Sequence, residues 1–424
     1  MKNLVRFGLA AAFVLALAAY EQGNQVKAAG GPSEAASGSY RVLAPIQSGN
    51  LLLFPVVRET GKSSGETPFI TLDEGIKSGE VEVTEAGSVQ GLVRPRRIVP
   101  PSNVPHQYHD DHLRAYPEGP ANSYRGDEVN TLVLVNNSKR PLLLLAGEIV
   151  TGGKQDRVIA KDRIVPVGAD PIDLSVFCIE PGRWTESSPT FGAAAKAPTH
   201  GFMVQPTVRE RAMVEKDQQQ VWDSVHGAIS QMEMAAAPSA SISMNGRPHP
   251  GPQYDMPSPS AIGTTSYAKV MQSNAVSDKV DEAAAPMMKA REQVLAQLRE
   301  EHAVGVVVAV RGEIVWADLF ADTGLLSRYW TKLVRSYAAE SLTEGDTHAA
   351  PSVADAQQFL NAPSGGAETS EGDVGIYRYR ELKSGATETF VLESLLPGTG
   401  YDVHTSKMQL IAPEHRNKPH QMLR

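Results

Sequence analysis

The sequence predicts an α+β fold with antiparallel strands in a β-sandwich or in barrel-like sheets, several packed helices, and disordered insertions. Two observations lead to this prediction. Short apolar runs rich in β-branched residues follow one another between residues 129 and 180, separated by Asn, Gly and Pro, as in antiparallel sheets. Elsewhere, apolar residues recur every three or four positions, which is typical of helices that bury one face.

Strands and helices are expected to occur in blocks along the chain. The expected strands are residues 50–57, 81–85, 129–137, 140–148, 157–168 and 171–180, a hairpin over 304–320, and three C-terminal segments at 375–382, 388–394 and 406–412. The expected helices are residues 71–79, about 221–232, about 287–301, and a segment that follows Asp322. Thr71 and Glu74 are spaced as a capping box at the start of the first helix. The last helix carries a broad apolar stripe from Leu325 to Tyr337, which is expected to be core.

Residues 1–19 are predicted to be a signal peptide. Lys2 and Arg6 precede an apolar core at residues 7–19, which is far shorter than the roughly 20 residues that span a bilayer. Tyr20 stands where a bacterial lipoprotein box would need a lipidated cysteine. The protein is therefore expected to be exported, soluble, and periplasmic or extracellular, with a lost lipoprotein anchor as the alternative.

The rest of the chain is predicted to hold a flexible linker at residues 20–39 and a single α+β domain at residues 40–424. Low-complexity insertions are expected at about 235–260 and at about 345–372, because these stretches are rich in Pro, Gly, Ser and Ala and lack periodicity. C-terminal strands are expected at about 373–412.

Composition limits the possible classes of function. The net charge of -8 argues against a nucleic-acid-binding protein, which would normally be basic. Cys178 is the only cysteine, so an intrachain disulfide is excluded. It lies within an apolar alternation, where a buried structural thiol is favoured over a nucleophile.

The stretch "AGEIVTGGKQDR" from Ala146 to Arg157 combines three glycines with charged residues directly after an apolar run. Its spacing does not match the phosphate loop, because Lys154 is followed by Gln155 rather than by a hydroxyl residue, and because strands are expected after it. Backbone N–H groups in such a glycine-rich turn can nevertheless form an anion cradle beside Lys154 and Arg157.

Several segments carry a resemblance to one known family. "LLLLAGEIVTGGKQDR", "DRIVPVGADPIDLSVFCIEPGRW" and "VGVVVAVRGEIVWADLFADTGLLSRYWTKLVRSYAAES" occur in order, and "NLLLFPV", "TLDEGIKSGEVEVTE" and "QQQVWDSV" fit the same pattern. They resemble the domain family named for its association with ADP-ribosylglycohydrolases and rhodanese-type phosphatases, over about residues 49–341 apart from the insertions. The mechanism of that family is uncharacterised. The resemblance implies an α+β domain and a role near ADP-ribose or phosphate chemistry.

The resemblance also implies a candidate ligand-binding set. The polar signature of the family falls on Glu148, Lys154, Gln155, Arg157, Glu180, Arg183 and Trp184. This sequence departs from the family pattern at three positions, where Ala146 and Ile149 replace acidic residues and Asp156 replaces an asparagine. If a carboxylate pair performs acid–base catalysis in the family, this sequence has lost it, and catalytic residues stay unknown.

Two interpretations of this set remain open from the residues themselves. In the first, the cations form a site for an anionic ligand, with Arg183 and Trp184 offering a planar fork and a stacking face. In the second, Glu148 or Glu180 pairs with Arg157 or Arg183, and the ion pairs only hold strands together.

The segment "PHQYHDDH" is a weak metal-site candidate. His106, His109 and His112 flank two aspartates, and imidazoles with carboxylates can ligate zinc. The segment has no counterpart in the family and follows a proline-rich stretch, so a solvated loop is favoured over a metal site.

These observations lead to one principal hypothesis of function and one alternative. The chain is expected to be an exported, non-catalytic binding or interaction module with an anion-accepting polar cluster. Its expected partner is an anionic small molecule or another exported protein, without nucleic acid, a membrane span or a cofactor. The alternative is a hydrolase or transferase acting on a phosphate- or ADP-ribose-containing ligand.

Overall fold

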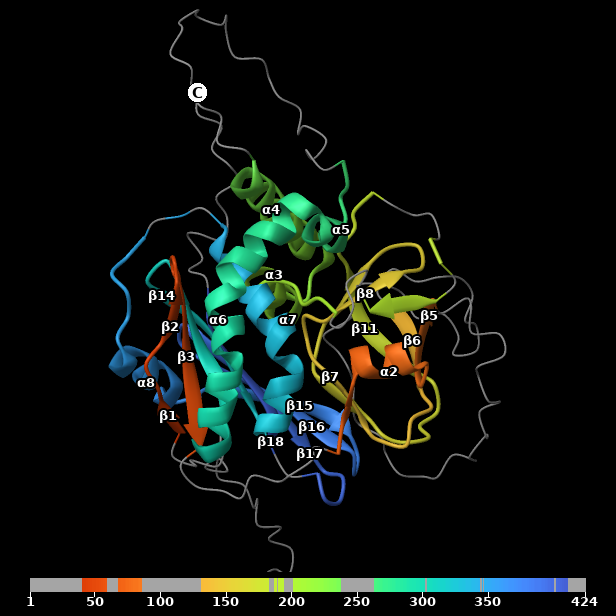
Figure 1. Cartoon of the computed structure of the whole chain (residues 1–424). Helices are drawn as coiled ribbons and strands as arrows, with labels where there is room; N and C mark the ends of the chain where they lie inside the picture. The colour runs from red at the N-terminus through yellow and green to blue at the C-terminus, as the bar shows by residue number, and fades with distance from the viewer. Residues whose placement is uncertain are drawn as a thin grey trace, which may run out of the picture. The chain divides into compact units, whose positions relative to one another are not determined.

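A computed structural model gives the fold of the chain (Figure 1). It describes residues 40–58, 68–85, 131–182, 187–188, 190–193, 201–237, 263–301, 303–343, 345, 347–399 and 402–410. Arg41–Arg424 group into one unit, to which the following description applies. Its mixture of helices and antiparallel sheets confirms the predicted α+β class.

The largest sheet has nine strands. Their order is β1 (Tyr40–Val42), β3 (Leu51–Arg58), β13 (Ala303–Val310), β14 (Glu313–Phe320), β18 (Asp402–Gln409), β17 (Thr387–Ser394), β16 (Tyr377–Ser384) and β15 (Ala367–Asp373), with β2 (Ile46–Ser48) also paired to β3. The strand pairs β2–β3, β3–β13, β13–β14, β14–β18, β18–β17, β17–β16 and β16–β15 are all antiparallel. The predicted hairpin is β13–β14, and it turns at Arg311 and Gly312, which both have positive φ, as a tight two-residue hairpin turn requires.

The second sheet is nearly closed into a barrel. Its six strands are β12 (Phe191–Ala193), β8 (Ile149–Gly152), β9 (Arg157–Ile159), β11 (Ile172–Cys178), β6 (Thr131–Asn136) and β5 (Val81–Glu85). An isolated bridge between Thr84 and Thr190 joins β5 to the start of β12, at the two ends of this order. Apolar side chains on one side of this sheet, such as those of Val83, Val150 and Val176, form a separate core cluster with side chains of the third sheet. Ile149, Val158 and Phe177 belong to the main core instead.

The third sheet has three strands, β10 (Arg163–Val165), β7 (Leu142–Leu144) and β4 (Ile70–Thr71). The pair β4–β7 is parallel, which is the exception to the predicted antiparallel pairing. The expected single strand over 157–168 is divided into β9 and β10, and Asp162 lies buried between them.

Two long helices, α6 (Asn274–Glu301) and α7 (Thr323–Ser341), cover one face of the large sheet (Figure 1). Helix α2 (Leu72–Ser78) contacts strands of the two smaller sheets, and α8 (Val353–Asn361) contacts β14. The remaining helical segments are α3 (Pro206–Glu210), the π-helix η2 (Arg211–Glu215), α4 (Gln218–Ala236) and α5 (Tyr267–Gln272). Helices α6 and α7 contact each other and the strands β3 and β13, and the apolar stripe of α7 is buried in the main core as predicted. None of the described helices is both long and apolar enough to cross a membrane.

Local sequence explains where several elements begin and end. Thr71 and Glu74 form the expected capping box of α2, and Gly79 ends that helix with φ 73°. Asp322 caps α7 by accepting a hydrogen bond from the backbone N–H of Leu325 at 2.9 Å. Cys178 is buried, as expected for a thiol that packs in the protein interior.

The structure differs from the expectation for residues 345–372. This stretch holds α8 and β15 rather than only irregular chain. Ser352 and Asp355 form a capping box that starts α8, and β15 pairs with β16 at every position from Ala367 to Asp373. Short polar elements of this kind lack an apolar pattern, so composition alone does not reveal them. The other expected insertion begins inside α4, and its residues from 238 to 260 lie outside the described part of the chain.

Candidate functional site

The glycine-rich turn joins β8 to β9 at the centre of the candidate site. Gly152 and Gly153 have φ values of 133° and 48°. A side chain at Gly153 would meet the ring of Phe191 and the carboxylate of Glu85, so both the backbone angle and the packing require glycine there.

The N–H groups of this turn hold carboxylates that belong to the chain itself. The N–H of Gly152 donates to Oδ1 of Asp156 at 3.2 Å, and that of Lys154 donates to Oε1 of Glu85 at 2.9 Å. The second Asp156 oxygen accepts from the hydroxyl of Ser266. The N–H groups that were expected to bind an external anion therefore donate to carboxylates of the chain itself.

Arg157 is fully buried beside this turn. Its Nη1 donates to the carbonyl of Gln155 at 2.7 Å, and its Nη2 lies 3.7 Å from Oε1 of Glu85. Glu180 accepts from the N–H of Asp156 at 3.1 Å and pairs with Nζ of Lys269 at 3.2 Å. The structure thus unites Lys154, Gln155, Arg157 and Glu180 of the predicted set.

We call this group the turn cluster. Its residues are Glu85, Lys154, Gln155, Asp156, Arg157, Glu180, Ser266 and Lys269. Arg183 and Trp184 lie outside the residues that the structure describes, as do His106, His109 and His112. Within the described ranges, no group of His, Cys, Asp and Glu is arranged to hold a metal ion.

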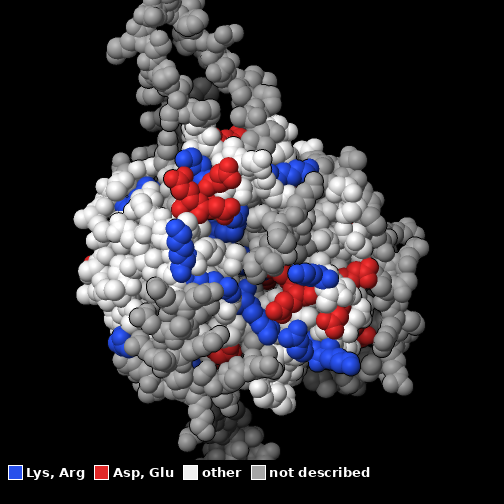
Figure 2. All heavy atoms as spheres, in the orientation of Figure 1, with Lys and Arg blue, Asp and Glu red and all other residues white. Residues whose placement is uncertain are grey.

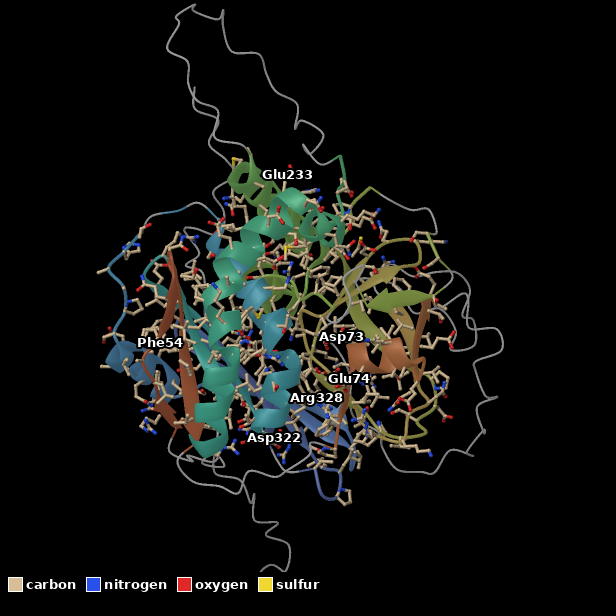
Figure 3. The ribbon with its side chains drawn as sticks, viewed as in Figure 1. Phe54, Asp73, Glu74, Glu233, Asp322 and Arg328 are labelled. Atoms are coloured by element: carbon tan, nitrogen blue, oxygen red, sulfur yellow. The ribbon has the colours of Figure 1, made fainter. Side chains whose placement is uncertain are left out.

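Glu148 makes its ion pair with a different segment. Its Oε1 lies 2.6 Å from Nζ of Lys332 on α7, and its Oε2 accepts from the N–H of Leu145 at 2.7 Å. The same ammonium lies 2.5 Å from Oδ2 of Asp73, at the start of α2. Glu148 and Lys332 are each about 1% exposed at the side chain, whereas Asp73 is 15% exposed. Asp73, which is labelled beside Glu74 in Figure 3, is therefore the most exposed member of this triad.

Burial and charge act in opposite directions on this triad. Burial is the largest effect on Glu148 and raises the pKa of its carboxyl, although Lys332 opposes the shift. Burial alone would lower the pKa of Lys332, but Asp73 and Glu148 together raise it above its ordinary value. Lys332 is thus held as a cation between two carboxyl groups.

A second buried network lies between the third sheet and the large sheet. Asp162 accepts from the N–H of Ala146 at 2.7 Å, and its other oxygen lies 2.6 Å from Nδ1 of His404 on β18. Nε2 of His404 lies 3.2 Å from Oδ1 of Asp318 on β14. Arg209 of α3 pairs with Oδ2 of Asp318 at 2.9 Å.

The charges of this network balance one another. Burial alone would lower the pKa of His404, but Asp162 and Asp318 raise it to about 9, so the imidazole is protonated near neutral pH. Burial also opposes the charge of Asp318, yet Arg209 and His404 hold its pKa well below the ordinary value. Two cations therefore face two carboxylates in the core.

Sequence reasoning missed most of the partners in these two networks. Their signals were charged residues inside otherwise apolar patterns. Lys332 interrupts the apolar stripe of α7, and Asp318 stands between Trp316 and Phe320 in an apolar strand. A charge at such a position is buried, and a buried charge needs a partner. Among the described residues, Arg157 lies beside Glu85, and Glu148 and Glu180 contact Lys332 and Lys269, which are partners that the sequence did not suggest. Arg183 lies outside the described residues, so its predicted pairing stays a prediction.

Comparison with known proteins identifies the family. No curated protein and no solved structure gives a significant match. A family profile matches residues 39–408, which extends beyond the 49–341 expected from the motifs at both ends. This range includes the turn cluster, the Glu148 triad and both partners of His404. The chain belongs to the ARG and Rhodanese-Phosphatase-superfamily-associated Protein domain family.

Proposed function

We propose that this chain is an exported, non-catalytic binding or interaction module. The observation that carries the proposal is the set of contacts made by Glu148 and Glu180, the two carboxylates of the candidate ligand-binding set. Glu148 is buried against Lys332, and Glu180 is buried against Lys269. A carboxylate that acts as general acid or base must reach a substrate within hydrogen-bonding distance, and these two are already bonded to cations and to backbone N–H groups.

The anion-accepting position of the module is the turn cluster. Its backbone N–H groups at Gly152 and Lys154 already donate hydrogen bonds to carboxylate oxygens. These contacts support the proposal that the turn can bind an anion. An external anion at this turn would take over donors that now serve Glu85 or Asp156, with the side chain of Lys154 as an additional cation. Phosphate and the diphosphate of ADP-ribose are anions of the required kind.

The alternative is a hydrolase or transferase that acts on a phosphate- or ADP-ribose-containing ligand. The name of the family, which records an association with such enzymes, is the reason to test it. For this activity Glu148 would have to leave Lys332 and reach solvent. A general acid often has a raised pKa, and the raised pKa of Glu148 is the property that favours this alternative.

Calorimetric titration with ADP-ribose and with inorganic phosphate tests the binding function. We expect saturable binding by the parent chain and a loss of affinity of about tenfold or more in Lys154→Ala, because one charge-assisted hydrogen bond contributes about 1.5–3 kcal/mol. Lys77→Ala, which changes an exposed lysine at the end of α2, is the matched control and should bind as the parent does.

Incubation of the same proteins with an ADP-ribosylated peptide and with a phosphate monoester distinguishes the alternative. We expect no product above the rate without protein. Turnover that disappears in Glu148→Gln or Glu180→Gln would reject the non-catalytic function. Absence of binding to either anion would reject the anion-accepting role of the turn cluster.

Export is tested by the N-terminus of the mature chain. We expect a protein produced in a bacterial host to be recovered from the periplasm or the medium, with a first residue near Ala19, because the short apolar core favours cleavage after small residues. N-terminal sequencing of each fraction gives the result. A cytoplasmic product that keeps Met1 would contradict export.

A further inference from the structure

Two glutamates lie buried next to each other in the β16–β17 hairpin of the large sheet. Lys383 lies directly opposite Glu388 in this strand pair, and Glu381 lies two residues before Lys383, so the three share one face of the sheet. The side chain of Glu388 is 1% exposed and that of Glu381 is 9% exposed. On the face drawn in Figure 2, acidic and basic side chains lie next to one another at the surface, where water solvates them. The two glutamates of the hairpin are instead withdrawn from water.

Two ammonium groups reach this pair from different segments. Nζ of Lys383 lies 3.0 Å from Oε1 of Glu381 and 3.3 Å from Oε1 of Glu388. Nζ of Lys216, which is 165 positions away in the chain, lies 2.7 Å from Oε2 of Glu381. We call Lys216, Glu381, Lys383 and Glu388 the latch cluster.

Lys216 stands at a break between two helical segments. It follows η2 and precedes α4, and its φ of 53° lies in the left-handed region, which few residues other than glycine adopt. Its N–H donates to the carbonyl of Arg211 at 3.1 Å, while its side chain is anchored on β16. Two positions later, Gln218 accepts from the N–H of Cys178 and donates to its carbonyl, both at 2.9 Å. The junction of η2 and α4 therefore connects the large sheet to the barrel-like sheet.

The two carboxyl groups hold one proton between them below neutral pH. Burial is the largest effect on Glu388, and together with the hydrogen bond to Glu381 it raises the pKa of its carboxyl to about 7, against the opposing effect of Lys383. Burial also acts to raise the pKa of Glu381, but hydrogen bonds with Glu388 and with the two lysines lower it to about 2. The carboxyl of Glu388 thus donates to the carboxylate of Glu381. Once that proton is lost, two like charges lie side by side, one of them on a side chain that water barely reaches.

The neighbouring elements add little charge to the latch cluster. Arg380 and Lys407 point to the other face of the sheet, because adjacent strand residues alternate. Tyr379 is two positions from Glu381, and its phenol stays neutral because burial and nearby carboxylates raise its pKa. The other charged groups on these elements have contacts of their own; they are Arg211 with Glu215 on η2, Asp217 as the cap of α4, and Lys161 and Arg163 with Glu371 and Asp373 on β15.

We propose that the latch cluster is a pH-sensitive latch between the helical layer and the sheet. The proton shared by Glu381 and Glu388 closes the contact between the η2–α4 junction and the β16–β17 hairpin, and its loss loosens this contact. Opening of the junction lets the second carboxylate reach water. The latch controls a conformation of the fold and no ligand takes part in it, so the inference goes beyond the proposed function.

The direction of the pH effect follows from proton linkage. In an opened or unfolded chain a glutamate titrates near its ordinary pKa of about 4.3, whereas Glu388 in the closed state titrates near 7. Its contribution is complete below about pH 4.3 and is lost as the pH rises through 7. The junction is therefore held most firmly in acid and least firmly in mild alkali.

Hydrogen exchange of the full chain, measured by mass spectrometry in peptides that cover residues 208–220, tests the latch. After correction for intrinsic exchange rates, the opening constant of this segment should rise about tenfold or more between about pH 5.5 and 8. Glu388→Gln keeps a donor to Glu381 but has no proton to lose, so its opening constant should stay nearly constant over this range. Glu371→Gln, an exposed change on the neighbouring strand β15, is the matched control and should open as the parent does.

Lys383→Met provides a second test at a side chain that is 51% exposed, where replacement is compatible with folding. It removes the cation that favours the charged form of Glu388, so the pH-dependent range should extend to higher pH. The proposal is overturned if the parent opens equally at both pH values, or if Glu388→Gln shows the same pH dependence as the parent. A range that stays in place or moves to lower pH in Lys383→Met would also reject it.

Discussion

An Asp318→Asn variant is expected to lose about 3–5 kcal/mol of unfolding free energy, the usual cost when one partner of a buried ion pair is removed. Asp318 is fully buried and accepts hydrogen bonds from Arg209 at 2.9 Å, from Ser406 at 2.9 Å and from Tyr337. Its replacement leaves the charges of Arg209 and His404 with Asp162 as the remaining carboxylate in this network. Urea unfolding followed by circular dichroism at pH 7 measures the loss.

The dependence of the unfolding free energy on pH shows how much of it comes from the ion pairs of His404. The folded-state pKa of His404, about 9, lies above the unfolded value of about 6.5. Its contribution is therefore complete below about pH 6.5 and is lost as the pH rises through 9. In Asp318→Asn one of the two carboxylates that raise this pKa is gone, so the alkaline loss should begin at lower pH.

Ser406→Ala is the control for this prediction. It removes the hydroxyl that donates to Asp318 and accepts from Nη2 of Arg209, but it leaves every charge in place, so a smaller loss of about 1–3 kcal/mol with an unchanged alkaline limb is expected. If Asp318→Asn lost no more than this control, the ion pairs would contribute little to folding.

A Lys332→Met variant is expected to lose a similar amount, about 3–5 kcal/mol, because Glu148 and Asp73 would share a buried region without their cation. The pKa of Glu148 is already raised by burial and should rise further. A raised carboxyl pKa gives a contribution that is present at low pH and lost as pH rises. The destabilisation should therefore be larger at pH 8 than at pH 5.

A double-mutant cycle measures the interaction directly. Adding Glu148→Gln to Lys332→Met removes the unpaired carboxyl group, so the double variant should be more stable than the sum of the two single losses implies. Lys279→Met, at an exposed position on α6, should change stability by less than about 0.5 kcal/mol. Additive losses in the cycle would show that Glu148 and Lys332 do not act as a pair.

Local elements followed from the sequence wherever a short pattern determines them. The capping box at Thr71, the Arg311–Gly312 hairpin and the stripe of α7 each depend on residues within a few positions of one another. Longer-range features did not follow. The first half of α6 and the helix α5 were missed, and nothing local indicates that Thr84 meets Thr190 to close the barrel.

The same limit applies to the candidate site. The sequence located the glycine-rich turn. Four residues of the predicted ligand-binding set also lie together there, because they belong to adjacent strands and to the segments that connect them. The partners of the buried charges come from distant segments, with Lys332 lying 184 positions after Glu148. Alternation in a strand shows that a charge points inward, but it does not show which cation or carboxylate the fold brings to it.

The pairing of β3 with β13 has a consequence for biosynthesis. Leu53 lies opposite Val308, so an almost wholly buried strand near the N-terminus has its neighbour in the last third of the chain. At about 5–20 residues per second, a ribosome needs roughly 10–50 s to make the intervening segment. During this time Leu51–Arg58 has its earlier neighbours β1 and β2 but lacks β13, which pairs with its other edge in the finished sheet. A nascent chain that ends before Ala303 cannot assemble the large sheet, and the apolar residues of β3 must be protected by other means until translation is nearly complete.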